Sequence, residues 1–157
     1  MGKEIERKYL VKKGAWSPQD SGTHFKQGYL NSQKERVVRV RIEGTIAKLT
    51  IKGITTGATR SEFEYPLPLG DAEVLLDQLC EQPLIDKHRH IEHHGGHTWE
   101  IDVFHGDNDG LVVAEVELAS ETEAITLPPW AGEEVTHDPR YFNSNLLKNP
   151  YRTWRDE

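Results

Sequence analysis

Charged residues stand two or four positions apart in seven segments of the sequence. Carboxylates are the preferred protein ligands of Mg²⁺ and Mn²⁺, whereas ammonium and guanidinium groups bind phosphate oxygens. Brought together, the two sets could hold a polyphosphate and the metal that bridges its oxygens. The charged sets are Glu4, Glu6 and Lys8; Arg39 and Arg41; Lys48 and Lys52; Glu62 and Glu64; Lys87 and Arg89; Glu100 and Asp102; and Glu115 and Glu117.

This spacing fits β-strands, because residues two apart on a strand point to the same face, about 6.6 Å from each other. The residues between the charges are mostly apolar, as in Val38, Val40 and Ile42. For any single pair, a solvated outer face over an apolar core is the simpler interpretation. The segregation of acidic from basic strands across seven segments favours an enclosed polar face. Two carboxylates about 7 Å apart repel by about 2 kcal/mol at an effective dielectric constant near ~20, so they need cations nearby.

The period of two predicts eight strands, separated by turn residues such as Gly44-Thr45 and Gly95-Gly96. Helical spacing of apolar residues predicts a helix over 71–81. Asp138 followed by Pro139 predicts the start of a C-terminal helix that ends before Pro150, and a weak helical turn is expected after Ser17-Pro18. The predicted strands are 4–11, 24–30, 36–42, 46–52, 60–66, 84–93, 97–104 and 111–118.

Eight strands are enough to close a barrel, which removes exposed sheet edges. We therefore predict a mainly β (α+β) fold: an eight-stranded antiparallel β-barrel whose charged faces turn inward and form a tunnel. The apolar faces then point outward and need covering, which we expect a few helices to provide.

Composition narrows the class of protein. The 157 residues predict one domain spanning 1–157, and 36% hydrophobic with 29% charged residues predicts a soluble globular chain. No stretch reaches the roughly 18 apolar residues of a membrane span, and the net charge of -7 argues against long nucleic acid as a partner. The lone Cys80 favours a reducing, cytoplasmic location. A homodimer is one alternative for the oligomeric state.

The segment Glu4-Ile5-Glu6-Arg7-Lys8 resembles the Glu-x-Glu-x-Lys signature of the CYTH superfamily, the triphosphate tunnel metalloenzymes. The other charged pairs follow it in order, so the resemblance extends to about residue 147. It implies an eight-stranded tunnel, a triphosphate as small-molecule substrate and dependence on Mg²⁺ or Mn²⁺. It also implies that a C-terminal helix around Tyr141 and Asn143 closes one tunnel end, as in compact bacterial members.

The resemblance also implies roles for individual residues. In the mechanism that we hypothesise, a second metal ion, or a carboxylate such as Glu4 or Glu6, would orient and deprotonate the attacking water. Alternatively, Lys8 and Lys87 would take part in proton transfer. The implied metal ligands are Glu4, Glu6, Glu115 and Glu117, with Glu62, Glu64 and Asp102 as further candidates. The implied phosphate-binding residues are Lys8, Arg39, Arg41, Lys52, Lys87 and Arg89.

The leading hypothesis is metal-dependent hydrolysis of a phosphoanhydride bond, with inorganic triphosphate as the substrate. A class IV adenylyl cyclase, a thiamine triphosphatase and a non-catalytic nucleotide- or polyphosphate-binding module remain alternatives. Five histidines between His88 and His97 fit either a solvated hairpin or a transition-metal site. The segment from Gly53 to Gly57 is interpreted as a turn, because no Gly-Lys-Ser/Thr follows it.

Overall fold

The computed structural model describes residues 3–154 of the chain, and its main feature is a closed antiparallel barrel. All eight predicted strands are confirmed, and a ninth short strand, β9, was not predicted. The strands are β1 (Lys3–Val11), β2 (Thr23–Asn31), β3 (Arg36–Glu43), β4 (Ile46–Gly53), β5 (Thr59–Leu67), β6 (Ile85–His94), β7 (His97–Phe104), β8 (Val112–Glu117) and β9 (Ala131–Glu134).

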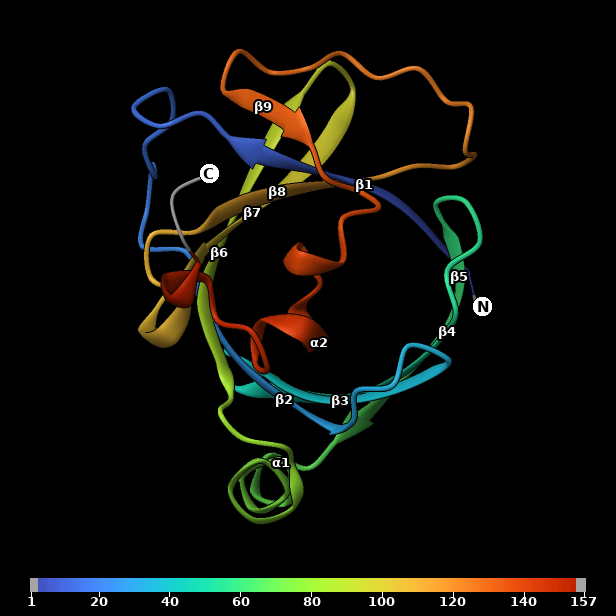
Figure 1. Cartoon of the computed structure of the whole chain (residues 1–157), viewed down its shortest axis with the longest axis vertical. Coiled ribbons are helices and arrows are strands. Elements are labelled where there is room, and N and C mark those ends of the chain that lie inside the picture. Colours follow the sequence, from blue (N-terminus) through green and yellow to red (C-terminus); the bar gives the residue numbers. More distant parts are fainter. Residues whose placement is uncertain (1–2, 155–157) are drawn as a thin grey trace.

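The strand order is β5-β4-β3-β2-β6-β7-β8-β1-β9, and an additional pairing between β5 and β1 closes the ring of eight strands. Figure 1 shows this ring end-on, with β9 outside it beside β1. Strand β1 holds three neighbours: β8 on one side, and β5 and then β9 along the other. The barrel therefore depends on β1, which also carries Glu4, Glu6 and Lys8.

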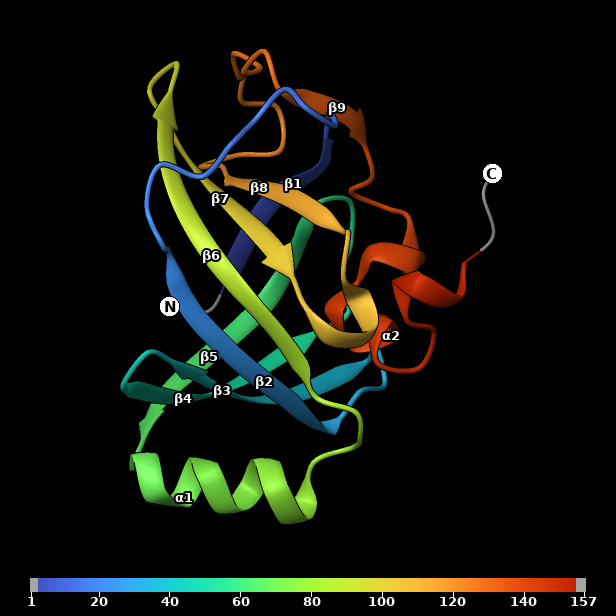
Figure 2. The same cartoon turned by 90° about the vertical axis from the view of Figure 1, so that its left-hand side faces the viewer.

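One apolar strip on the outside of the barrel is covered by a helix, as expected. Helix α1 (Leu69–Val74) continues as a π-helical turn, η1 (Leu75–Leu79), and lies outside β3 and β4 (Figure 2). Ala72, Leu76 and Cys80 are buried against Val40 and Ala47. Burial raises the pKa of the Cys80 thiol to about 11. Leu79 lies three residues after Leu76, which is the spacing of a shared helical face, but it is 64% exposed, because the π-turn rotates it away from the sheet.

The outer face of β1, β7 and β8 is covered by β9 and its preceding segment, so the expectation that helices would cover it is wrong. Trp130 packs edge-on against Trp99, with ring centroids 5.5 Å apart, and the Tyr9 ring lies tilted against Trp99 at a centroid distance of 5.6 Å. Trp99 is fully buried by these contacts. The large, flat indole of Trp130 can cover several strand residues at once. An irregular segment that carries such a side chain is therefore enough to cover this apolar face.

The C-terminal region forms three short helices where one was predicted: η3 (Pro139–Tyr141), α2 (Asn143–Leu146) and η4 (Tyr151–Thr153). Asp138 accepts a hydrogen bond from the Arg140 backbone N–H, as expected of a capping residue. The extended backbone of Phe142 separates η3 from α2. Leu146 and Leu147 pack among strand ends at one end of the barrel, and Figure 1 shows α2 within the ring.

The weak helical turn expected after Ser17-Pro18 is wrong, because the residues there form no helix. A 3₁₀ turn that was not predicted, η2 (Gly106–Asn108), lies between β7 and β8. Among residues 3–154, no helix is long and apolar enough to cross a membrane.

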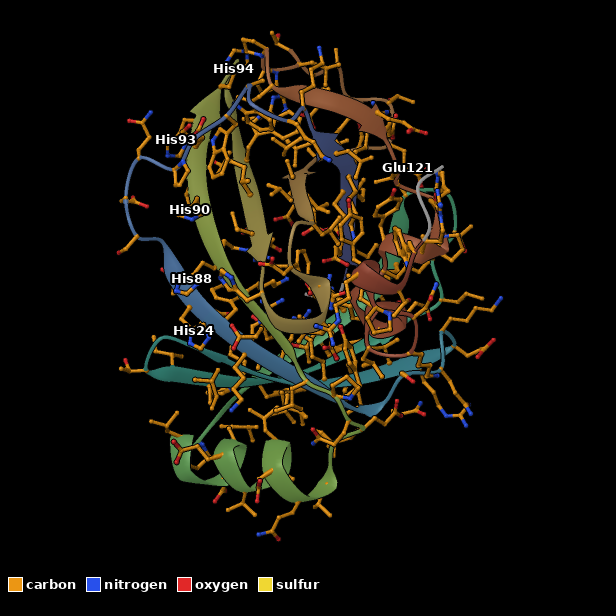
Figure 3. All side chains as sticks on the ribbon, turned by 60° about the vertical axis from the view of Figure 1, so that its left-hand side comes forward. His24, His88, His90, His93, His94 and Glu121 are labelled. Atoms are coloured by element: carbon orange, nitrogen blue, oxygen red, sulfur yellow. The ribbon has the colours of Figure 1, made fainter. Side chains whose placement is uncertain are left out.

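Histidines line the outer face of β2 and β6, from His24 to the β6–β7 hairpin (Figure 3). His88 Nδ1 lies 2.8 Å from His105 Nε2, and His24 Nε2 lies 2.8 Å from Asp86 Oδ1. No three His, Cys, Asp or Glu side chains in the described part of the chain lie close enough together to hold a metal ion by themselves. A ready-made transition-metal site is thus not present there.

The His88–His105 pair generates a pH prediction. Burial, followed by the nearby His105 and His24, lowers the pKa of His88, and Asp86 only partly opposes this. The pKa of His88 is lower in the folded than in the unfolded state. The contribution of His88 to stability is therefore fully present above the unfolded pKa and is lost as the pH falls from there through the folded pKa. We expect the thermal midpoint of the wild type to decrease as the pH is lowered from about 7.5 to about 5.5. The decrease should be smaller in His88→Gln.

Thermal denaturation followed by circular dichroism at several pH values checks this expectation. His93→Gln, at the exposed hairpin, serves as the matched control and should keep the wild-type pH dependence. An identical pH dependence in His88→Gln would show that this pair does not contribute.

Candidate active site

The interior of the barrel encloses a cavity of about 780 Å³. Among the described residues, eight basic and eight acidic side chains line it. Every residue assigned a role from the sequence faces it except Asp102. The basic residues are Lys8, Arg39, Arg41, Lys48, Lys52, Arg60, Lys87 and Arg89, and the acidic ones are Glu4, Glu6, Glu43, Glu62, Glu64, Glu100, Glu115 and Glu117.

Asp102 lies behind the cavity wall, where it holds two cations. Its carboxylate accepts hydrogen bonds from Arg89 Nε at 2.8 Å and Arg89 Nη2 at 2.9 Å, and from Lys87 Nζ at 2.7 Å. Burial alone would raise the pKa of Asp102, but Arg89 and Lys87 outweigh burial and lower it. Burial lowers the pKa of Lys87 to about 7 although Asp102 opposes this. Asp102 thus fixes the positions of two candidate phosphate-binding residues.

The aromatic ring of Phe25 packs against the guanidinium groups of Arg41 and Arg89. This role was not predicted from the sequence. Its ring centroid lies 4.9 Å from Arg41 Cζ and 4.6 Å from Arg89 Cζ. Cations over an aromatic face gain electrostatic attraction from the ring without losing their hydrogen-bond donors. Strand β2 carries no inward pair of charges, because its inward residues, Phe25, Gln27 and Tyr29, are uncharged.

Arg39 carries an unused donor. Its Nη2 donates to Thr50 Oγ1 at 3.3 Å, but its buried Nε has no hydrogen-bond partner among the described residues. The neighbouring Arg41 is better satisfied, since it donates to Gln27 Oε1 and to Glu43 Oε2, each at 3.0 Å. Burial and the adjacent cations lower the pKa of Arg41 to about 10. An unsatisfied buried donor is costly, so the oxygen of a bound anion would fit beside Arg39.

Glu4 and Glu115 are each engaged by two cations. Glu4 contacts Lys52 Nζ at 3.1 Å and Arg60 Nε at 3.2 Å, and these cations lower its pKa although burial opposes them. Glu115 contacts Lys8 Nζ at 3.4 Å and Arg89 Nη2 at 3.8 Å. Arg60 was not predicted, although it lies two positions before Glu62 on the same strand face, so the spacing rule could have found it.

Glu6 and Glu117 differ from the other cavity carboxylates. They lie opposite each other in the β1–β8 register, and neither makes an ion pair or side-chain hydrogen bond with a described residue. Burial, with Glu115 and Glu4, raises the pKa of Glu6 well above its ordinary value. Burial, with Glu4 and Glu62, raises the pKa of Glu117. The donor set suits a divalent cation that takes its remaining ligands from phosphate oxygens and water, as Mg²⁺ commonly does.

Comparison with known proteins places these observations in context. The CYTH domain model matches residues 2–148. A curated inorganic triphosphatase from Acetivibrio thermocellus is 47% identical over 99% of this chain and 100% of its own length. A second one, from Nitrosomonas europaea, is 37% identical over 91% of this chain and 95% of its own. A crystal structure of an inorganic triphosphatase aligns with a TM-score of 0.65 at 35% identity, covering 92% of this chain and 93% of the other.

The position of Asp102 generates a prediction about stability. Replacing it by Asn removes the carboxylate that pairs with the buried Lys87 and the closest carboxylate to Arg89, which keeps only Glu100 and Glu115. Breaking a buried ion pair from one side is strongly destabilising, so we expect the free energy of unfolding to fall by about 3 kcal/mol. Urea denaturation measures this change.

Glu100→Gln is the matched control, because Glu100 pairs with the same Arg89 at 3.2 Å from a side chain that is 42% exposed. Its effect should stay below about 1 kcal/mol. Equal losses in the two variants would contradict the structural role assigned to Asp102.

Proposed function

This chain belongs to the CYTH domain family, and we propose that it is a metal-dependent hydrolase that cleaves a phosphoanhydride bond of inorganic triphosphate. The observation that carries the proposal is the charge balance of the cavity, with eight basic and eight acidic side chains among the described residues. A highly charged polyanion adds negative charge to a lining that is formally neutral. It therefore needs cations that enter with it, in addition to the lysines and arginines.

The proposed phosphate contacts are the basic residues that face the cavity. Arg39 has a buried Nε donor to offer, and Lys87 and Arg89 are held in place by Asp102. Guanidinium groups suit phosphate oxygens because they donate two parallel hydrogen bonds. The full proposed set is Lys8, Arg39, Arg41, Lys52, Lys87 and Arg89.

The proposed metal-binding residues centre on Glu6 and Glu117, which have no cation partner among the described residues. Glu4 and Glu115 are next in rank because lysine and arginine already engage them. Glu62 and Glu64 face the cavity as further ligands, whereas Asp102 has a supporting role. Oxygen ligands suit Mg²⁺ or Mn²⁺. A bound divalent cation would offset charge on the phosphate oxygens as the P–O bond breaks.

In the proposed reaction, a water molecule attacks one terminal phosphorus, and the bond from that phosphorus to the bridging oxygen breaks. The products are phosphate and pyrophosphate. Glu6 is the candidate that orients the water and accepts its proton, since its carboxylate faces the cavity and is not occupied by a described cation. Lys8 and Lys87 are candidates to donate a proton to the departing oxygen.

The buried thiol of Cys80 agrees with a cytoplasmic location, which remains a prediction.

Replacing Glu6 by Ala tests the proposal. We expect turnover of inorganic triphosphate in the presence of Mg²⁺ or Mn²⁺ to fall by about 100-fold or more, the usual contribution of a positioned general base. Colorimetric phosphate release measures the rate, and ion chromatography identifies the products.

Glu73→Gln, an exposed position on α1, provides the control and should keep the wild-type rate. Wild-type turnover should also stop when EDTA removes divalent cations. Full phosphate release by Glu6→Ala, or cleavage that is indifferent to EDTA, would contradict the mechanism. Release of pyrophosphate from ATP with formation of a cyclic nucleotide would instead identify a cyclase.

A further inference from the structure

The barrel closes at the β1–β5 seam, which here means the contact of Lys3–Ile5 with residues 58–61. Among the described residues this ladder has three pairs: Lys3 with Ser61, Glu4 with Arg60, and Ile5 with Thr59. One further bond runs from the Glu6 backbone N–H to the Ala58 carbonyl at 3.3 Å. Within residues 3–154, the shortest ladder of the eight-stranded ring therefore lies at Glu4 and Glu6.

Glu121 joins both sides of this seam from the outside. Its carboxylate accepts hydrogen bonds from the Ala58 backbone N–H at 3.2 Å and from Thr59 Oγ1 at 2.6 Å. Its backbone carbonyl accepts a bond from Arg7 Nη2 at 2.8 Å. Glu121 belongs to the segment between β8 and β9, and Figure 3 shows it next to the tip of the β4–β5 hairpin. One residue thus fixes β1 and β5 to a third part of the chain.

Gly57 makes this close approach sterically feasible. A Cβ at position 57 would lie 2.3 Å from Glu121 Oε1, a distance at which two heavy atoms cannot coexist. The backbone of Gly57 also has a φ of +64°, which disfavours any side chain. The turn therefore presents bare backbone to the Glu121 carboxylate.

We propose that Glu121 is a positioning residue for the Glu4–Glu6 site. The contacts form a continuous path: Glu121 holds Ala58 and Thr59, and the next residue, Arg60, pairs with Glu4. The Ala58 carbonyl in turn holds the backbone of Glu6. Glu121 does not line the cavity, so it acts through these residues. This inference rests on the proposed roles of Glu4 and Glu6.

Glu123 offers a matched comparison within the same segment. Its carboxylate accepts bonds from the Ala119 backbone N–H at 2.6 Å and pairs with His97 at 2.5 Å. It therefore anchors the same segment with the same charge, but its carboxylate makes no hydrogen bond or ion pair with a described residue of β1 or β5. A general loss of order in the segment would follow from either substitution, whereas misplacement of Glu4 and Glu6 would follow only from the loss of Glu121.

The experiment compares wild type with Glu121→Ala, Glu121→Gln and Glu123→Ala. For each protein it measures kcat and KM for inorganic triphosphate and the Mn²⁺ concentration that gives half-maximal rate. It also measures Mn²⁺ affinity in the absence of substrate, by electron paramagnetic resonance, and the thermal midpoint.

We expect Glu121→Ala to lower kcat about 10-fold and to weaken Mn²⁺ binding several-fold, with a smaller change in KM, because small displacements of reacting groups are costly. Glu121→Gln keeps an acceptor oxygen and should recover most of the loss. Glu123→Ala should change the thermal midpoint at most.

The inference is overturned if Glu121→Ala retains kcat and Mn²⁺ affinity within twofold and loses only thermal stability, or if Glu123→Ala reproduces its defects. If wild type binds Mn²⁺ but does not cleave triphosphate, the proposed function fails, and the positioning role is then decided by the Mn²⁺ affinities alone. Absence of Mn²⁺ binding by wild type would overturn both.

Discussion

Charge pairing across strands is the constraint on which this barrel depends. Eight basic and eight acidic side chains among the described residues face one cavity, and a buried carboxylate is costly unless a cation offsets its charge. The contacts from Asp102 to Arg89 and Lys87, and from Glu4 to Lys52 and Arg60, provide that offset. These contacts also hold the cations in a fixed arrangement before a ligand binds. Such preorganisation favours the binding of a polyanion.

The balance is not uniform over the cavity. Basic groups gather where Phe25 supports Arg41 and Arg89, whereas Glu6 and Glu117 face each other without a described cation. In the proposed function, the first region binds phosphate oxygens and the second binds the metal ion. Strand order contributes to this separation, because acidic β1 and β8 are neighbours and basic β3 and β4 are neighbours on the other side of the ring. Strand β6 adds Arg89 to the basic group because it pairs with β2, which carries Phe25.

Much of this arrangement could be predicted from sequence because the period of two assigns each strand residue to one face without ambiguity. The eight barrel strands and their inward-facing charges could be predicted for that reason. Phe25 was missed because an inward aromatic residue looks like part of an ordinary apolar face. Strand β9 has only four residues and no alternation, and the packing of Trp130 on Trp99 joins residues far apart in the chain. Such contacts depend on the tertiary structure, and local sequence carries no signal for them.

The most direct test of the central claim is a crystal structure with Mn²⁺ and a methylene-bridged triphosphate analogue that resists hydrolysis. The account predicts phosphate oxygens within hydrogen-bond distance of Arg39 Nε and Lys87 Nζ, and an anomalous peak for Mn²⁺ beside the carboxylates of Glu6 and Glu117. An analogue bound outside the barrel, or a Mn²⁺ peak away from those two carboxylates, would contradict it.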